Sequence, residues 1–297
     1  MKSIQNPIPL INPAEDLTSE KVKELLDPNA MRGYPTGIET LDKIILGIKP
    51  GLYIFSAVRG TGKTWFALQM AKALWISSEI RSIFFTLEMT TDQLQQRCLQ
   101  AWSGLTEEEV RAGKNIDKGL AHLKEGFLQF APVYDEPNFD YSSFEAEIER
   151  GKSMGIKLFI LDHLHLVRGA SSREALNVLA DWASESKKLA SRLGVTIWIL
   201  AQPTKYSEGK IIVSDSIKGT GAIPDAADVV ITLSRERKDL KEKPSNDCWL
   251  SVEKNRLGGH MYEGFSLAFT DRGEFVETNA VARKQEFIDN VFKEVIT

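Results

Sequence analysis

The sequence predicts an α/β fold with a mainly parallel twisted sheet, helices on both faces and antiparallel strands at one edge. Short runs rich in β-branched and aromatic residues alternate with stretches of helical periodicity along most of the chain. The early runs are almost continuously apolar, as expected of parallel strands covered on both faces. The last runs are separated by short turns, which favours antiparallel additions at an edge.

The first segment, residues 1–32, is rich in proline and polar residues apart from one short amphipathic helix predicted over residues 18–26. Thr18 can cap this helix, and Asp27-Pro28 ends it. A single helix of this length is not stable alone, so we expect it to dock on its own domain or on a neighbouring subunit. The sequence leaves both alternatives open.

The main domain is expected over residues 33–278. Its strands are expected at the runs GLYIFSA, RSIFFTL, IKLFILD, TIWILA, DVVITLS, CWLSVEK and GFSLAF. Helices are expected over 65–76 and 174–193, the first with an apolar stripe formed by Phe66, Ala67, Met70, Ala71 and Leu74. Residues 279–297 are predicted to form an amphipathic tail helix that packs on the domain or docks on a partner.

Composition excludes several classes of protein. The chain has 297 residues, of which 42% are hydrophobic and 26% charged, the usual mixture for a globular protein. No apolar run approaches the roughly 20 residues of a membrane span, and the N-terminus lacks the apolar core of a signal peptide, so we expect a cytosolic protein without a membrane partner. The net charge of −4 argues against nucleic-acid binding through bulk positive charge. Cys98 and Cys248 lie far apart and predict neither a zinc site nor a disulfide.

The segment SAVRGTGKT, residues 56–64, has the pattern of a phosphate-binding loop, with Ala57 where the pattern has its first glycine. A predicted strand precedes it and a predicted helix follows it, so backbone N–H groups at the helix N-terminus can face phosphates. Lys63 would contact the β and γ oxygens, and the Thr64 hydroxyl would bind Mg²⁺. We therefore expect ATP or another NTP, with Mg²⁺, to be bound by Ala57, Val58, Arg59, Gly60, Thr61, Gly62, Lys63 and Thr64.

Three further strands end in polar side chains. Asp162 closes an apolar run and is the candidate second ligand for Mg²⁺. Glu88 is the candidate general base, although a carboxylate at the start of a helix is the alternative. Gln202 is the candidate sensor of the γ-phosphate. Because ligands collect at the carboxyl ends of parallel strands, the convergence of these residues with Lys63 predicts an NTP hydrolase.

Two histidines, His163 and His165, follow the Asp162 strand. An H-x-H pair can bind a metal, but no third cluster of ligands is visible in the sequence. We therefore expect these side chains to pack or to make hydrogen bonds.

Together these motifs resemble those of the hexameric replicative helicases of the RecA-like superfamily, which includes DnaB, the helicase half of phage primase-helicases and Twinkle. The resemblance runs from about Gly33 to Glu277 and implies a RecA-like P-loop NTPase core. GYPTGIETLDKIILGIKPG resembles the lead-in to the P-loop, AVRGTGKTWFALQMA the first motif, FFTLEM the motif of the catalytic glutamate, LFILDHLHLV the Walker B strand and WILAQPTK the sensor strand. Two stretches are more diagnostic, because P-loop proteins in general lack them: IKGTGAIPDAADVVITLSRE resembles the DNA-binding loop, and SVEKNRLGGHMYEGFSLAF resembles the segment with a Lys-x-Arg pair.

The resemblance implies that Arg256 is an arginine finger that reaches the nucleotide of the adjacent subunit, with Lys254 beside it, whereas KNR alone would be taken for a solvated hairpin turn. Six copies of two loops around a channel would form a ring of positive charge that holds a single DNA strand. Each basic residue taken alone could equally be an ordinary solvated side chain. The candidate DNA-binding residues are Arg168 and Arg173 in the first loop, and Lys205, Lys210, Lys218, Gly219 and Gly221 in the second.

The function predicted from the resemblance is an ATP-dependent replicative DNA helicase. It would hydrolyse NTP at the subunit interfaces of a hexameric ring, move along single-stranded DNA and unwind duplex, in the bacterial cytosol or a phage-infected host cell. The chain has no zinc-binding segment and no room for a primase domain, so we expect a stand-alone motor with a separate primase or loader. Two alternatives stay open: a filament-forming recombination ATPase of the RecA/RadA type, and a nucleotide-switched replication adaptor or loader that does not unwind DNA.

Overall fold

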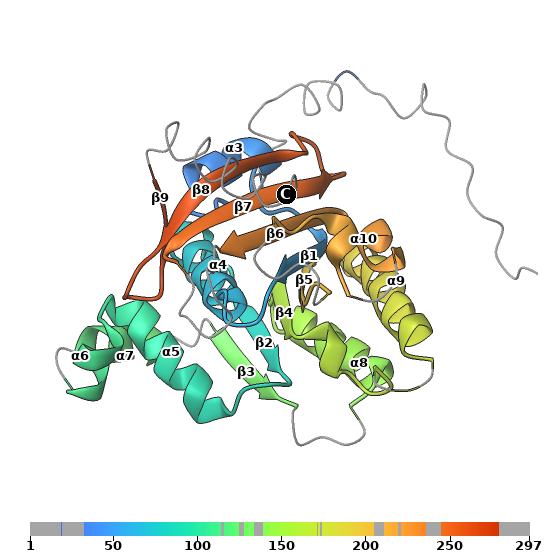
Figure 1. Cartoon of the computed structure of the whole chain (residues 1–297). Coiled ribbons are helices and arrows are strands. Elements are labelled where there is room, and N and C mark those ends of the chain that lie inside the picture. Colours follow the sequence, from blue (N-terminus) through green and yellow to red (C-terminus); the bar gives the residue numbers. More distant parts are fainter. Residues whose placement is uncertain are drawn as a thin grey trace, which may run out of the picture.

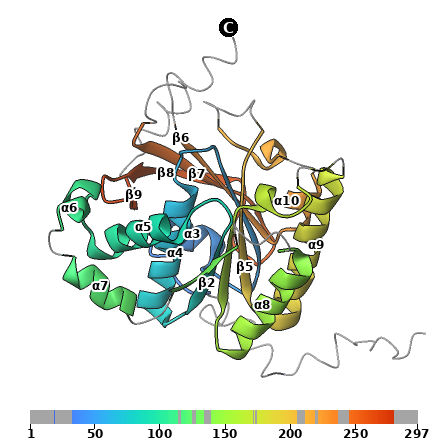
Figure 2. The same cartoon turned by 90° about the horizontal axis from the view of Figure 1, so that it is seen from below.

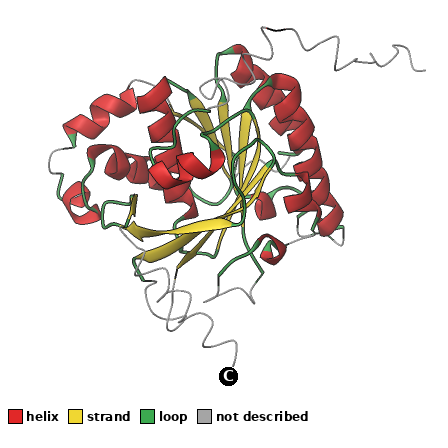
Figure 3. Cartoon of the chain, turned by 90° about the horizontal axis from the view of Figure 1, so that it is seen from above, coloured by secondary structure: helices red, strands yellow, loops and turns green. Residues whose placement is uncertain are grey.

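The computed structural model describes residue 19 and residues 33–113, 116–124, 128–133, 139–170, 172, 174–204, 211–218, 221–235 and 245–278. Apart from Ser19, the tail helices predicted over 18–26 and 279–297 lie outside these residues. The described residues form one α/β unit, in which helices cover both faces of a twisted sheet (Figures 1 and 3).

The sheet contains nine strands in the order β3-β2-β4-β5-β1-β6-β7-β8-β9. All pairs from β3 to β6 are parallel, and β7, β8 and β9 are antiparallel additions at one edge. The predicted fold class, a mainly parallel sheet with antiparallel edge strands, is therefore confirmed. The strands are β1 (Gly51–Ala57), β2 (Ser82–Thr86), β3 (Leu128–Pro132), β4 (Leu158–Asp162), β5 (Thr196–Ala201), β6 (Val229–Arg235), β7 (Asp247–Asn255), β8 (Glu263–Phe269) and β9 (Phe275–Glu277).

The helices divide between the two faces, as the view along the sheet in Figure 2 shows. On one face lie α3 (Glu39–Ile45), α4 (Lys63–Ser78), α5 (Thr91–Ser103), α6 (Glu107–Arg111) and α7 (Asp117–Lys124). On the other lie α8 (Tyr141–Ser153), α9 (Ala175–Leu193) and α10 (Ala222–Ala226). Two short 3-10 helices, η1 (Leu164–Leu166) and η3 (Ser214–Ser216), lie in the loops after β4 and β5. Within the described part of the chain, no helix combines the length and the apolar composition that a bilayer span requires.

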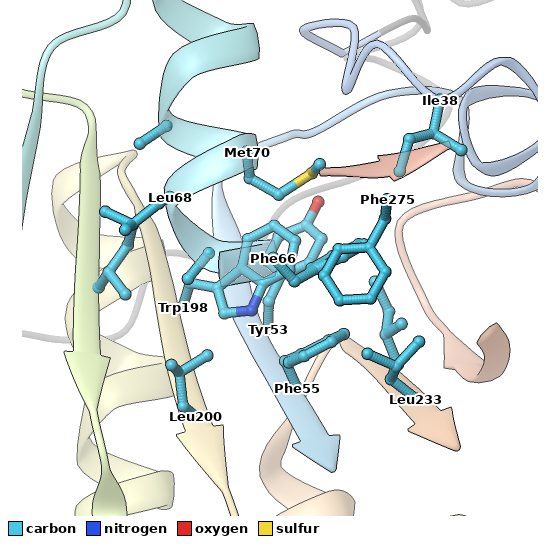
Figure 4. Close-up of a cluster of buried hydrophobic side chains, with 14 of the residues drawn as sticks. Ile38, Tyr53, Phe55, Phe66, Leu68, Met70, Trp198, Leu200, Leu233 and Phe275 are labelled. Carbon is cyan, nitrogen blue, oxygen red and sulfur yellow. The ribbon is translucent and has the colours of Figure 1, made fainter. Parts of the chain in front are cut away.

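Alternation along β1 explains why both faces are covered. Tyr53 and Phe55 belong to the core under α4, whereas Leu52 and Ile54 belong to the core under α8 and α9. The ring of Phe66, on α4, stacks on Phe55 with centroids 4.5 Å apart (Figure 4). A strand that is apolar on both sides can be satisfied only between two layers of helices, and this burial holds the end of β1 rigidly in place.

Candidate active site

The loop between β1 and α4 has the geometry of an anion-binding turn. Gly60 and Gly62 take positive φ values of 79° and 114°, and Gly62 is the N-cap of α4 without a side-chain cap. A Cβ atom on Gly62 would come within 2.8 Å of Cζ of Phe275, so a larger residue would be both strained and crowded. The turn therefore directs the N-terminal backbone N–H groups of α4 toward the space above the loop.

Ala57 and Lys63 close the base of this loop. Ala57 is the last residue of β1 and is fully buried in the core, so its methyl group takes the place that the usual glycine leaves empty. The Nζ atom of Lys63 donates a hydrogen bond of 2.9 Å to the carbonyl oxygen of Ala57. Burial lowers the pKa of the Lys63 ammonium, and the nearby carboxylates of Asp162 and Glu88 oppose this effect.

Asp162 lies directly beside the start of α4. Its Oδ2 atom accepts a hydrogen bond of 2.7 Å from Oγ1 of Thr64, while its Oδ1 atom has no hydrogen-bond partner among the described residues. The side chain is only 2% exposed, and burial raises its pKa, with the Thr64 hydroxyl and Lys63 opposing the shift. An ionised oxygen that is buried without a partner is costly unless a cation or a strong donor completes it.

Glu88 and His163 extend the cluster at the same edge of the sheet. Glu88 follows β2 by two residues, and the turn that carries it is fixed by Thr86, whose hydroxyl donates 2.7 Å to the carbonyl of Met89. The Oε2 atom of Glu88 is 3.3 Å from Nδ1 of His163. The ligand atoms of Glu88, Asp162 and His163 all lie within 4.8 Å of one another. His163 is buried, in line with the packing predicted for it, and the three-residue group with metal-ligand chemistry that it joins is a feature that the sequence did not predict.

His163 is held in its neutral form. Burial, followed by the positive charge of Lys63, lowers the pKa of this imidazole to about 3. A neutral ring can offer a lone pair, whereas an imidazolium would repel both Lys63 and a bound cation.

Gln202 and Lys218 are joined at the end of β5. The backbone N–H of Lys218 donates 2.9 Å to the carbonyl of Gln202, and Pro203 pairs with Ile217 in an antiparallel bridge. The segment that ends at Lys218 therefore starts and finishes at the carboxyl edge of the sheet. Lys218 is exposed, and Gly221 is the N-cap of α10.

The other candidate DNA-binding residues fall into two groups. Arg168 is exposed in the loop after η1, which follows β4. The remaining candidates lie outside the described residues: Arg173, Lys205, Lys210 and Gly219.

Lys254 and Arg256 lie near the end of the sheet at which β1 begins, whereas the phosphate-binding loop follows the end at which β1 finishes. Strand β7 runs against β6 (Figure 1), so Asn255 pairs with Val229 at the start of β6, whereas Ala57 pairs with Leu233 near its end. Four residues of strand separate these positions by about 13 Å. Arg256 is exposed. Because of the offset along the strands, its guanidinium cannot reach the phosphate-binding loop of the same subunit unless β7 leaves the sheet.

Hydrogen bonds fix both the side chain of Lys254 and the backbone of Arg256. Nζ of Lys254 donates to the carbonyls of Pro224 and Asp225 in α10, at 2.6 and 2.8 Å. The N–H of Arg256 donates 2.8 Å to the carbonyl of Asp228. The buried carboxylate of Asp228 in turn accepts from Leu52 N and pairs with Lys187. The position of Arg256 is thus tied to the first residues of β1.

Three residues near the site, Arg97, Arg235 and Phe269, were not predicted from the sequence. The Arg97 guanidinium, on α5, lies 5.5 Å from the centroid of Trp65; burial lowers its pKa, and Asp162 and Glu88 oppose this. The Arg235 guanidinium lies 4.8 Å from the ring centroid of Phe269, and its Nη1 atom donates 3.2 Å to the carbonyl of Thr61. Arg235 ends β6, so the rule that polar residues gather at strand ends could have found it. Nothing local marks Arg97 or Phe269.

A buried parallel strand, a glycine-rich turn, a helix and a neighbouring strand that ends in aspartate define a P-loop nucleotide-binding domain. Within that class, the chain belongs to the family of the DnaB-like helicase C-terminal domain, whose sequence profile matches residues 33–275. It is 31% identical over 240 residues to the replicative DNA helicase DnaB of Leifsonia xyli subsp. xyli, which covers 77% of this chain and 52% of that relative. The family predicted from the motifs is therefore confirmed.

Solved structures support the same fold. One of them, the structure of an ATPase domain, matches with a TM-score of 0.76 and 20% identity, covering 88% of this chain and 96% of that domain. A DnaB-like replicative helicase, described together with its interactions with primase, matches with a TM-score of 0.73 and 20% identity over 83% of this chain and 64% of that chain. The chain spans about half the length of the curated relatives that it matches.

Proposed function

We propose that residues 33–278 are the NTP-hydrolysing motor of a replicative DNA helicase, which works as a homo-oligomeric ring of six subunits on single-stranded DNA. One observation supports this proposal most strongly. The phosphate cradle follows the carboxyl end of β1, whereas β7 ends at Asn255, between Lys254 and Arg256, about 13 Å back along the strand direction from the level of Ala57. A subunit whose arginine cannot reach its own cradle is suited to serve the cradle of a neighbour.

The nucleotide in this proposal is ATP or another NTP, with Mg²⁺ held by Thr64 and Asp162. The residues fit a hard cation, because the buried Oδ1 of Asp162 has no partner and the Thr64 hydroxyl is 2.7 Å from Oδ2. When bound, the ion would neutralise charge on the β and γ phosphates. The stacked pair Arg235 and Phe269, fixed on Thr61, offers a planar cationic surface beside the loop for the nucleobase.

Each side chain at the site has a distinct role in hydrolysis. Glu88, 38% exposed, accepts the proton of the attacking water, since it is the carboxylate of the cluster with access to solvent. Lys63 stabilises charge on the phosphate oxygens, and the hydrogen bond from its Nζ atom to the carbonyl oxygen of Ala57 holds it at the base of the loop. Gln202 contacts the γ-phosphate from the end of β5 and responds to its loss.

Arg256 of one subunit supplies a guanidinium to the phosphoryl group bound by the next, with Lys254 beside it. Hydrolysis is thereby tied to contacts between subunits, and the loops after β4 and β5 carry DNA through the ring. The DNA contacts would be Arg168, Arg173, Lys205, Lys210 and Lys218, with Gly219 and Gly221 in the same loop as Lys218. A separate primase or loader is the further partner, and the cytosol of a bacterium or of a phage-infected cell is the place of action.

The test measures ATP turnover with and without an oligo-dT strand, and the unwinding of a forked duplex. We expect single-stranded DNA to stimulate turnover and the fork to open. Glu88→Gln should lower turnover by about 10²–10⁴-fold and keep nucleotide binding, whereas the exposed Asp92→Asn on α5 should leave both unchanged. Turnover that ignores DNA, with no strand separation, would overturn the helicase proposal. A Glu88→Gln protein whose activity stays intact would instead favour a nucleotide-switched adaptor or loader, which has less need for a general base.

A further inference from the structure

His165 occupies a junction that hydrolysis chemistry does not use. It lies in η1, three residues after Asp162, and its half-buried ring points toward the end of β5. Nε2 of His165 is 2.5 Å from the carbonyl oxygen of Lys218, and Nδ1 accepts a hydrogen bond of 3.4 Å from the backbone N–H of Gln202. A single ring therefore links the loop after β4 to both ends of the segment between Gln202 and Lys218.

The two contacts define the protonation of the ring. Since the N–H of Gln202 is a donor, Nδ1 must carry the lone pair, and the proton is on Nε2, which donates to Lys218. Burial lowers the pKa of His165, which keeps the ring in this neutral form. The orientation is thus specified at both nitrogens, in contrast to a side chain that only fills space.

A continuous path runs through this ring from the hydrolysis site to the candidate DNA loop. Glu88 lies 3.3 Å from His163, and the His163 and His165 ring centroids are 6.0 Å apart. Beyond His165 comes Lys218. Apart from the ring, the bond from Lys218 N to Gln202 O joins the end of β5 to this segment.

We propose that His165 is a positioning residue that couples the nucleotide state of the cluster around Asp162 to the segment of residues 211–218, which ends at Lys218. A displacement of η1, which begins two residues after Asp162, is passed by the ring to the Lys218 carbonyl. Removal of the ring uncouples the loop and leaves the hydrolytic groups in place. The inference rests on the proposed function in taking the cluster around Asp162 to bind nucleotide and the segment to contact DNA.

Three full-length variants test this role. His165→Leu removes both hydrogen bonds, and His165→Gln keeps an amide donor for Lys218. His165→Asn, too short to reach Lys218, serves in place of leucine if that protein does not fold. Leu166→Ala, at a 45% exposed neighbour on η1, controls for perturbation of the 3-10 helix.

Two readouts are measured: ATP turnover with and without oligo-dT, and hydrogen exchange of amides in 211–218 with and without a non-hydrolysable ATP analogue. For His165→Leu we expect basal turnover within about threefold of wild type, because the ring contacts the backbone N–H of Gln202 and not its side chain. Stimulation by DNA should fall at least about fivefold, the lower end of typical coupling between sites. The nucleotide-dependent change in exchange should disappear, and both responses should persist in His165→Gln and Leu166→Ala.

The outcomes separate this inference from the proposed function. Wild-type protein that ignores oligo-dT, yet shows a nucleotide-dependent exchange change that His165→Leu removes, keeps the coupling and rejects the helicase. Normal stimulation and normal exchange in His165→Leu reject the coupling and keep the helicase. Wild-type exchange that does not respond to nucleotide also rejects the coupling, as does an equal loss of basal and stimulated turnover in His165→Leu.

Discussion

The hydroxyl of Thr64 donates a hydrogen bond of 2.7 Å to the carboxylate of Asp162, across 98 residues of sequence. This contact joins the start of α4 to the end of β4, strands β4 and β1 being separated by β5 in the sheet. Both groups offer an oxygen atom that can bind a metal ion, and the second carboxylate oxygen, Oδ1 of Asp162, is buried without a hydrogen-bond partner among the described residues. Both oxygens have the chemistry that Mg²⁺ prefers, which is the basis for the metal site proposed here.

Substitution of Thr64 tests that arrangement. Thr64→Ala removes one oxygen ligand and should raise the Mg²⁺ concentration for half-maximal ATP turnover by about 10–100-fold, the usual cost of losing a supporting group at a metal site. Thr64→Ser keeps the hydroxyl and should stay close to wild type. The measurement is a Mg²⁺ titration of turnover at saturating ATP. Identical titration curves for the alanine and serine proteins would remove Thr64 from the proposed metal site.

The aromatic packing behind the loop should contribute strongly to stability. Phe66 is fully buried, stacks on Phe55 and meets Phe275 edge-on with centroids 5.5 Å apart. Phe66→Ala should lower the free energy of unfolding by about 3–5 kcal/mol, through lost transfer energy and the cavity left behind. Ile76→Ala, at a 68% exposed position on the same helix, should change it by no more than about 0.5 kcal/mol. Urea denaturation gives both values, and equal effects would contradict the packing described.

The buried thiol of Cys248 predicts a loss of stability at high pH. Burial raises its pKa from 9.0 to about 12, with the charge of Arg235 opposing. In this pH range the unfolded thiol loses its proton first, so the unfolded chain binds fewer protons and the free energy of unfolding falls as pH rises from about 9 toward 12. Between pH 8 and pH 10 wild type should lose about 1.4 kcal/mol more than Cys248→Ala. Urea denaturation at the two pH values measures this difference, and parallel losses would contradict a buried neutral thiol.

Local patterns were sufficient for the parts of the site that lie on single strand ends. Ala57 to Thr64 could be placed because strand, turn and helix are contiguous, and Asp162 because a charged residue closes an apolar run. Strand β3 was missed, since Leu128–Pro132 is short, only half-buried where described and ends in proline, so it carries little of the apolar signal of a central strand. Arg97 was missed because a helical arginine looks solvated until the packing of α5 brings it to the carboxylates.

Contacts between distant segments lay beyond sequence reasoning for the same reason. Phe269 and Arg235 meet only because β6, β7 and β8 pair in one register, which depends on the whole antiparallel edge. Strand order had no local signature either. Arg256 lies far from the phosphate-binding loop of its own subunit because β7 is antiparallel to β6. The proposed ring can therefore be tested by placing the loop and the arginine on different subunits.

Mixed assemblies of two inactive variants should recover activity. Arg256→Ala should lower turnover by about 10³–10⁵-fold. Its subunits still carry an intact cradle with Glu88, whereas Glu88→Gln subunits still carry Arg256. In a ring formed from equal amounts of both, about a quarter of the head-to-tail interfaces combine an intact cradle with an intact arginine. Co-expression with two affinity tags yields such rings, and turnover should approach about a quarter of wild type if interfaces act independently.

The control for this mixture pairs Glu88→Gln with Lys63→Ala. Both substitutions damage the cradle side, so no interface in the mixed ring regains a complete site, and turnover should stay at the level of the separate variants. Recovery in this control would mean that subunits compensate for each other by some route other than the arginine. Absence of recovery in the Arg256→Ala mixture, with rings verified by both tags, would mean that Arg256 does not complete a neighbour's site, and the split-site proposal would fall with it.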